Sequence, residues 1–193
     1  MQRVCVFCGS SAGGDPIHAN VARQMGALLA ERGLALVYGG GNVGLMGVVA
    51  DAVLAGGGEV IGIIPRHLAD KELAHRRATE MHIVGSMHER KALMAEKGDA
   101  FIALPGGYGT FEEFFESVTW AQLGLHEKPC GLLNVAGFYD PLLALVDHAV
   151  TEGFIRTRHR EMLVVDDEPG RLLDRLRDYR PVYVPKWIGP NDL

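Results

Sequence analysis

The residues best suited to chemistry lie in one glycine-rich stretch, Pro105-Gly106-Gly107-Tyr108-Gly109-Thr110. A short apolar run, Asp99 to Leu104, precedes it with the length of a strand, and apolar residues at helical spacing follow it. The stretch is therefore predicted to be a strand-to-helix turn. Glycines let the backbone approach a ligand closely, and a new helix offers unpaired N–H groups and the positive end of its dipole. This combination favours an anion site, and phosphate in particular.

Glu113 adds a carboxylate to the start of the same helix. Two interpretations stay open from the residues alone. In the first, Thr110 is the N-cap and Glu113 completes a capping box. In the second, Glu113 takes part in catalysis, because a pocket that only bound an anion would not favour a negative side chain there. On a helical wheel Glu113 lies nearly opposite the apolar stripe of Phe111, Phe114, Phe115 and Val118, so we expect it to face away from the core and toward the mouth of the turn.

Arg90 is the second candidate. The stretch from Ser86 to Lys97 is predicted to be a helix, and Arg90 shares its face with Met87 and Met94 rather than with solvent. An arginine on an apolar face needs an anionic partner. A snorkelling side chain or an internal salt bridge is the alternative. With Glu113 and a phosphate site expected nearby, we favour an arginine in a pocket.

Other catalytic patterns are absent from the sequence. The eight histidines show neither HxxxH nor HExxH spacing, so no metal site is indicated. GxSxG and GxxxxGK[ST] motifs are also missing, which disfavours a serine hydrolase and an ATPase. A phosphate cradle with one carboxylate and one arginine suits a reaction through a cation, such as cleavage of a glycosidic bond to ribose.

Strands and helices alternate along the chain, which predicts an α/β fold with a doubly wound, Rossmann-like parallel sheet. Strands are expected at residues 3–8, 35–38, 59–64, 82–84, 99–104, from about 130 to 133 and at 162–165. Helices are expected at residues 16–31, from the turn at 39–44 to about 55, at 86–97, from the turn at 105–110, at 141–152 and at 169–179. Residues 65–80 are expected to be irregular. No linker or repeat interrupts the pattern, so residues 1–193 are predicted to form a single domain.

Three glycine-rich turns should meet in one crevice of this sheet, because ligands bind where strand connections reverse direction. The turns span Gly9 to Gly14, Gly39 to Gly44 and Gly106 to Gly109. The second formally satisfies the dinucleotide motif GxGxxG. The acidic residue expected after the next strand is missing, however, since that strand runs into Pro65. Binding of NAD is therefore not predicted.

Composition excludes several classes of protein. The formal charge of −5 argues against a general nucleic-acid binder. Three cysteines, an odd number, do not suggest a disulfide framework, and Cys5 and Cys8 are expected on opposite faces of a strand. Neither a leader peptide nor an apolar run long enough for a membrane is evident. We expect a cytoplasmic protein with no membrane partner.

Taken together, these motifs resemble those of a known family. Residues 105–113 match PGGxGTxxE, residues 87–91 match MHxRK, and Cys8-Gly9-Ser10-Ser11 and Tyr38-Gly39-Gly40-Gly41 also agree. The chain is similar to the Lonely guy family, the cytokinin riboside 5′-monophosphate phosphoribohydrolases, often mislabelled lysine decarboxylases. The resemblance runs from Val4 to about residue 180, and residues 185–193 lie outside the pattern. No lysine sits in a recognisable pyridoxal-phosphate context.

The resemblance implies hydrolysis of AMP or an N6-modified (for example prenylated) AMP to a free base and ribose 5-phosphate, without a cofactor or metal. It implies a homodimer as well. Arg90 and Glu113 would be the catalytic pair. The substrate-binding residues that it implies are Gly9, Ser10, Gly40, Gly41, Glu72, Met87, Lys91, Pro105, Gly106, Gly107, Tyr108, Gly109, Thr110, Glu112 and Thr119.

A nucleotide or cofactor carrier that binds without turnover is the alternative function, because related α/β carriers share the glycine-rich turns. The combination of Arg90 and Glu113 favours the enzyme, since a carrier of an anion gains nothing from a carboxylate beside it.

Overall fold

The computed structural model describes residues 1–71 and 74–181. In this part of the chain, seven parallel strands form one sheet in the order β4-β3-β2-β1-β5-β6-β7. The strands are β1 (Arg3–Phe7), β2 (Ala35–Tyr38), β3 (Val60–Pro65), β4 (Glu80–Val84), β5 (Ala100–Ala103), β6 (Cys130–Leu133) and β7 (Leu163–Asp166). The central strands are short apolar runs because helices cover both of their faces. The predicted doubly wound fold is confirmed.

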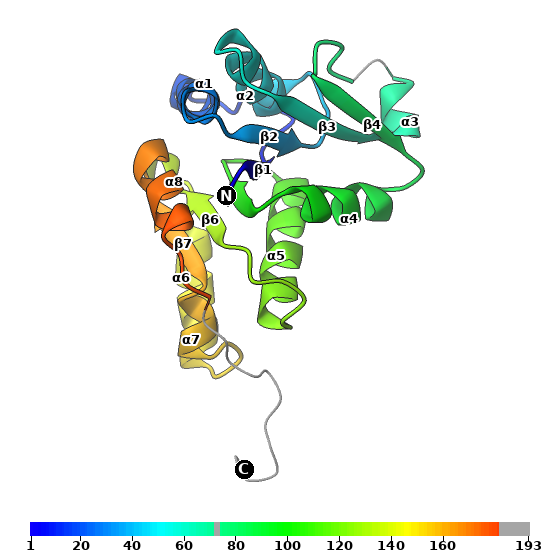
Figure 1. The fold of residues 1–193 in the computed structure, drawn as a ribbon. Coiled ribbons are helices and arrows are strands. Elements are labelled where there is room, and N and C mark those ends of the chain that lie inside the picture. The colour runs from blue at the N-terminus through cyan, green and yellow to red at the C-terminus, as the bar shows by residue number, and fades with distance from the viewer. Residues whose placement is uncertain (72–73, 182–193) are drawn as a thin grey trace.

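Two helical layers cover the sheet (Figure 1). One face carries α1 (Pro16–Glu31), α2 (Gly44–Ala55) and α8 (Pro169–Arg177), and the other carries α4 (Met87–Lys97), α5 (Tyr108–Gln122) and α6 (Asp140–Thr151). The short helices are α3 (Arg66–Ala69), α7 (Thr157–Arg160) and the 3-10 turn η1 (Val135–Gly137). The sequence did not predict these three short elements.

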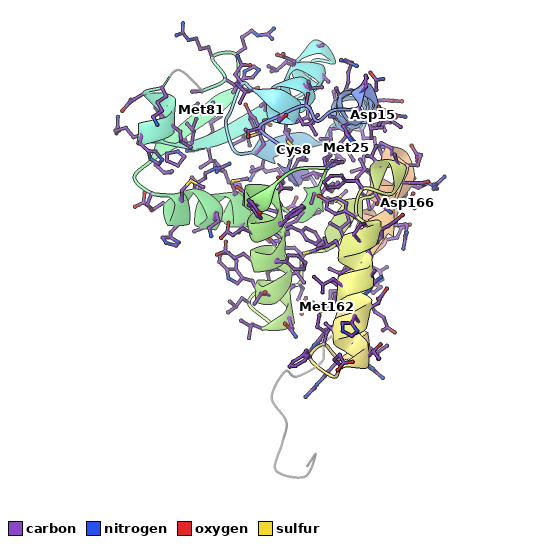
Figure 2. All side chains as sticks on the ribbon, turned by 180° about the vertical axis from the view of Figure 1, so that it is seen from behind. Cys8, Asp15, Met25, Met81, Met162 and Asp166 are labelled. Atoms are coloured by element: carbon purple, nitrogen blue, oxygen red, sulfur yellow. The ribbon has the colours of Figure 1, made fainter. Side chains whose placement is uncertain are left out.

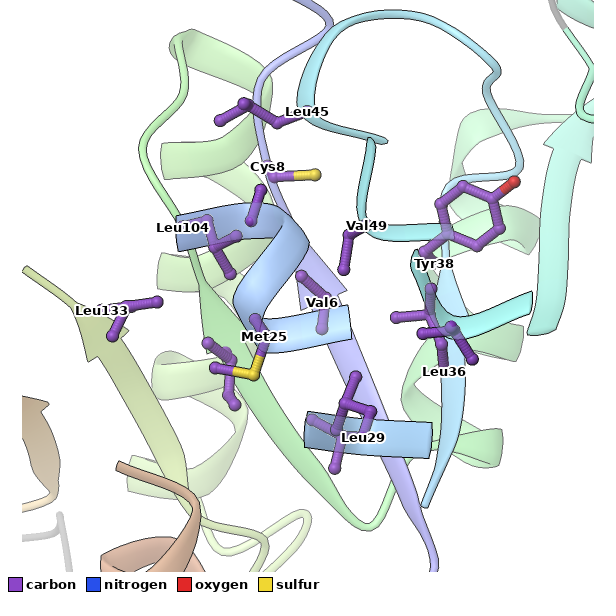
Figure 3. Close-up of a cluster of buried hydrophobic side chains, with 14 of the residues drawn as sticks. Val6, Cys8, Met25, Leu29, Leu36, Tyr38, Leu45, Val49, Leu104 and Leu133 are labelled. Atoms are coloured by element: carbon purple, nitrogen blue, oxygen red, sulfur yellow. The ribbon is translucent and has the colours of Figure 1, made fainter. Parts of the chain in front are cut away.

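Each layer has its own hydrophobic core. On the first face, Met25 and Leu29 of α1 pack with Val6 of β1 (Figure 3). On the second, Met94 of α4 and Phe114 of α5 pack against the opposite side of the same strands. Burial of apolar side chains on both faces is the main stabilising contribution to such a sheet.

The cysteines follow this division. Cys8 belongs to the first core and Cys5 to the second, so the predicted opposition of the two side chains is confirmed. Both thiols, and that of Cys130, are free and buried. In Figure 2, Cys8 lies in the interior of the molecule, whereas Asp15 lies at the start of α1.

Helix starts follow the capping signals. Asp15 accepts a hydrogen bond from the N–H of Ile17, at 2.9 Å, and α1 begins at Pro16 as expected. Ser86 accepts one from the N–H of Glu89 at 3.1 Å and caps α4. The Glu89 carboxylate accepts from the N–H of Gly85 rather than of Ser86, so the cap is one residue wider than a standard capping box.

The strand order reverses between β1 and β5. From β1 the chain proceeds through β2, β3 and β4 on one side, and from β5 it proceeds to β6 and β7 on the other. The turns after these two strands are therefore neighbours, and the N–H of Gly9 donates to the carbonyl of Pro105 at 3.0 Å. This is the crevice in which open α/β sheets bind ligands.

Candidate active site

The turn after β5 forms the expected cradle at the start of α5. Gly107 is the N-cap, in an extended conformation, and no side chain caps the helix. The backbone N–H groups of its first turn consequently have no intrahelical acceptor, and the positive end of the helix dipole lies at the same point. An anion would satisfy both.

The prediction of Thr110 as the N-cap was wrong. Helix α5 begins at Tyr108, so Glu113 lies beyond the N3 position and cannot close a capping box with Thr110. The helix starts earlier because Gly107 supplies the extended cap and Tyr108 and Gly109 adopt helical backbone angles. The capping-box interpretation of Glu113 is thereby excluded.

Glycines of the cradle have two different roles. A Cβ at Gly106 would lie 2.1 Å from Oγ1 of Thr110, so the turn and the helix pack too closely for any side chain there. A Cβ at Gly107 or Gly109 would meet no atom within 4 Å. These two glycines therefore leave open space against which a ligand can approach the backbone.

The three glycine-rich turns converge as predicted. Residues after β1, β2 and β5 line a cavity of about 390 Å³ together with residues of α2, β3, α3, α4 and α5. It is lined by Cys8, Gly9, Ser10, Gly39, Gly41, Val43, Met46, Ile64, Leu68, Arg90, Gly107, Tyr108, Gly109, Thr110 and Glu113. Both candidate catalytic residues thus lie at the cavity that the cradle opens into.

Arg90 and Glu113 form a buried ion pair. Nη2 of Arg90 lies 3.2 Å from Oε1 of Glu113, and each residue is only 8% exposed. The expected anionic partner of the arginine is therefore confirmed. Nη1 also lies 3.7 Å from Sδ of Met87, while Nε has no hydrogen-bond partner among the described residues.

The expectation that Glu113 faces away from the core was wrong. Its side chain lies on the buried face of α5 with Thr110, Phe114 and Ser117. Of the stripe expected to define the buried face, Phe114 is buried, whereas Phe111, Phe115 and Val118 are only partly buried. The cavity lies on the side of the helix that faces the sheet. Glu113 can therefore be buried and line the cavity at the same time.

Burial raises the pKa of Glu113 above the usual range of a glutamate. The positive charge of Arg90 opposes this shift, and the neighbouring Glu112 adds to it. A carboxylate in a poorly solvated pocket, beside a single cation, strongly stabilises positive charge that develops nearby.

Gly39 is a residue whose role the sequence did not predict. A Cβ at this position would lie 1.8 Å from Nη2 of Arg90 and 2.8 Å from its Cζ, so the guanidinium occupies the space of the missing side chain. The sequence did contain a signal for this role, because Gly39 is the first glycine of the GxGxxG pattern. That pattern is typical of a dinucleotide-binding turn, whereas here the glycine leaves room for the side chain of an arginine.

An apolar wall of the cavity was also missed. It consists of Val43 and Met46 at the start of α2, Ile64 in β3 and Leu68 in α3. No local spacing in the sequence links them, since only the fold brings them together.

The remaining predicted site residues lie in three different places. Gly40, Pro105 and Gly106 belong to the turns but do not line the cavity. Met87, Lys91, Glu112 and Thr119 lie outside the lining, and Glu72 lies outside the described residues. The Lys91 ammonium pairs with Glu112 and, at 3.0 Å, with Glu116, and so joins α4 to α5 beside the site.

Relatives of the chain decide its family. The chain is 53% identical over 180 residues to a rice protein named probable cytokinin riboside 5′-monophosphate phosphoribohydrolase LOGL2, covering 93% of this chain and 74% of that protein. It is 52% identical to cytokinin riboside 5′-monophosphate phosphoribohydrolase LOG2 of Arabidopsis thaliana, covering 98% of this chain and 91% of that one. The chain belongs to the cytokinin riboside 5′-monophosphate phosphoribohydrolase family.

A phosphoribohydrolase is a hydrolase of the N-glycosidic bond, so the protein is an enzyme of this class. A family model described as possible lysine decarboxylase matches residues 46–176. That description fits the site poorly. Among the described residues that line the cavity there is no lysine, so none of them could form the imine that a pyridoxal-phosphate decarboxylase requires.

Solved structures share the fold of this phosphoribohydrolase at low sequence identity. The molybdenum cofactor binding protein from Rippkaea orientalis superposes with a TM-score of 0.70 at 21% identity, over 92% of this chain and 97% of that one. The likeness establishes the fold alone, because one fold hosts many functions.

Proposed function

We propose that this protein hydrolyses the N-glycosidic bond of AMP or an N6-modified AMP, giving the free base and ribose 5-phosphate. The observation that supports this most is the buried pair of Arg90 and Glu113, 3.2 Å apart, in the cavity that the cradle at the start of α5 opens into. The cradle binds the 5′-phosphate through backbone N–H groups. The ribose then lies beside the carboxylate.

Cleavage of the bond from ribose to a base passes through an oxocarbenium-like state. In the proposed mechanism Glu113 stabilises this positive charge or orients the attacking water. Its contact with Arg90 supports a role for the arginine in holding the carboxylate in place. The other edge of the guanidinium then remains available to the substrate. The reaction needs no cofactor and no metal. In residues 1–71 and 74–181, no cluster of His, Cys, Asp or Glu could hold a metal ion.

The test is release of free base. Purified protein is mixed with AMP and, separately, with N6-isopentenyl-AMP, and the products are separated by chromatography. We expect adenine or isopentenyladenine in equal amount to ribose 5-phosphate. Binding of both nucleotides without any release of base would reject the proposal in favour of a carrier.

The protein is further proposed to be a cytoplasmic homodimer. Three buried free thiols support a reducing compartment, and no helix in the described part of the chain is long and apolar enough to cross a membrane. Light scattering after gel filtration tests the dimer, which requires twice the mass of 20.9 kDa. A single monomer peak at assay concentration would contradict it.

A further inference from the structure

The turn that carries the cradle is held at its base by three hydrogen bonds. The N–H of Leu104, the residue after β5, donates to the carbonyl of Phe7 at 2.9 Å. The carbonyl of Pro105 accepts from the N–H of Gly9 at 3.0 Å. The third bond is the only one of these made by a side chain: the hydroxyl of Tyr139 donates to the carbonyl of Leu104 at 2.6 Å.

Tyr139 reaches this carbonyl from the start of α6, in the connection that follows the neighbouring strand β6. After β6, Asn134 ties the chain to β7, since its N–H donates to the carbonyl of Asp166 at 2.8 Å. Its side-chain oxygen then accepts from the N–H of Tyr139 at 2.7 Å. The intervening turn contains Ala136 at φ 50°, the only non-glycine residue with a positive φ in the described chain. A strained backbone of this kind persists where the surroundings fix it, and it is common near functional sites.

Packing alone does not require the hydroxyl. Tyr139 is 1% exposed, and its ring contacts Phe138 and Phe111 edge-on. A phenylalanine would make the same ring contacts. The hydroxyl adds only the bond to Leu104, directly before the Pro105 turn, so its specific contribution is to the position of that turn.

We propose that Tyr139 is a positioning residue for the phosphate cradle. Its hydroxyl fixes the carbonyl of Leu104, and the turn and the N–H groups of Gly107 to Thr110 are thereby held in the geometry that binds the 5′-phosphate. Tyr139 itself does not line the cavity and does not touch the ligand. The inference rests on the proposed function in one respect, namely that the anion is the phosphate of a ribose 5-phosphate group.

Tyr139→Phe is the decisive variant. Since one net hydrogen bond is worth roughly a two- to tenfold change in an equilibrium constant, we expect the Kd for ribose 5-phosphate, measured by calorimetry, to rise roughly fivefold. The kcat/KM for AMP should fall by a similar factor while that for adenosine, which lacks the phosphate, stays near wild type. Introducing p-aminophenylalanine at position 139 keeps an N–H donor of similar size, and it should restore part of the affinity. This second variant also serves if Tyr139→Phe does not fold.

Tyr38 provides a matched control. It is fully buried, and its hydroxyl has no hydrogen-bond partner among the described residues. Tyr38→Phe should therefore change neither the Kd nor the ratio of kcat/KM between AMP and adenosine. A Tyr139→Phe protein that melts earlier but keeps both values of the wild type would overturn the proposal, because the hydroxyl would then be purely structural. Equal Kd values for the phenylalanine and p-aminophenylalanine variants would overturn it too.

Failure of the proposed function gives a different result. If the wild type binds ribose 5-phosphate but releases no base from AMP, the hydrolase assignment is wrong. In that case, comparing the Kd for ribose 5-phosphate between the wild type and the Tyr139 variants still tests the positioning role of Tyr139. If the wild type does not bind ribose 5-phosphate at all, the positioning role proposed for Tyr139 is wrong.

Discussion

At Gly39 the missing side chain is what lets Arg90 reach Glu113. The guanidinium fills the space that a Cβ would occupy, with Nη2 at 1.8 Å from that position. Arg90 in turn provides the positive charge that opposes the raised pKa of the buried carboxylate. The three residues come from the end of β2, from α4 and from α5. A change in any one of them should alter the geometry of the other two.

Gly39→Ala should inactivate the enzyme without unfolding it. The added methyl group displaces the far end of a flexible side chain rather than backbone, so the protein should still fold, with a melting temperature lowered because the buried pair of Arg90 and Glu113 is disturbed. Misplacement of a catalytic group by about 1 Å can cost on the order of a hundredfold in rate. We expect kcat for AMP to fall by roughly that factor, as measured by release of adenine.

Gly14→Ala is the control for this substitution. A Cβ at Gly14 would meet no atom within 4 Å, so both rate and stability should be unchanged. If Gly39→Ala kept its full kcat, the position of the Arg90 guanidinium would not matter for catalysis.

The raised pKa of Glu113 predicts the acid limb of the pH profile. A carboxylate stabilises a cation only when it is ionised, so activity is present above its pKa and is lost as the pH falls through it. Bound phosphate adds negative charge nearby and shifts the pKa further in the same direction. The kcat for AMP should therefore fall with a midpoint above about 4.3, the ordinary value for glutamate. A kcat that stays constant down to about pH 4 would show that the active form does not need an ionised Glu113.

Among the elements, α5 carries most of the site. Its N-terminus forms the cradle, and its buried face places Glu113 in the cavity with Arg90. Because Gly107 and not a side chain caps the helix, the N–H groups of the first turn remain available to a ligand. In the proposed mechanism, remote binding of the phosphate helps to hold the ribose against the carboxylate.

The cradle predicts a strong preference for the 5′-monophosphate. Binding energy from the phosphate, which does not react, can position the ribose for cleavage, so kcat/KM for AMP should exceed that for adenosine by about a hundredfold or more. Release of adenine from the two substrates under the same conditions measures the ratio. Equal values would mean that the start of α5 does not bind the phosphate.

The sequence predicted the elements well where the local signals were strong. Asp15 and Pro16 mark the start of α1, and the apolar partners of Arg90 on α4 revealed its burial. It failed at β4, which begins at Glu80 rather than His82, because this strand lies at the edge of the sheet and, with Glu80 and Ile83 exposed, lacks the continuous apolar run of a buried strand. It also failed at the start of α5, where the glycines suggested a turn although Tyr108 and Gly109 already belong to the helix.

For the molecule as a whole, the reversal of strand order at β1 and β5 creates the site. The reversal brings the turns after these strands side by side, and the neighbouring β2 adds Gly39 and Gly41. The sequence predicted this convergence from topology rules. It could not predict the apolar wall from Val43 to Leu68, because contacts between separate elements leave no pattern in any single one. A molybdenum cofactor binding protein shares the fold, so the fold alone does not determine the chemistry, which the proposed mechanism assigns to Arg90 and Glu113.

Glu113→Gln tests the central claim most directly. Glutamine keeps the size of the side chain and an acceptor for Arg90 but removes the negative charge. We expect a folded protein with a lowered melting temperature, since the buried arginine loses its counter-charge. AMP binding, measured by calorimetry, should survive because the cradle is unchanged. Release of base from AMP should fall roughly a hundredfold or more in kcat, the scale of removing one preorganised electrostatic group. A folded Glu113→Gln protein that binds AMP and releases adenine at nearly the wild-type rate would contradict the mechanism, and Glu112 would be the next carboxylate to test.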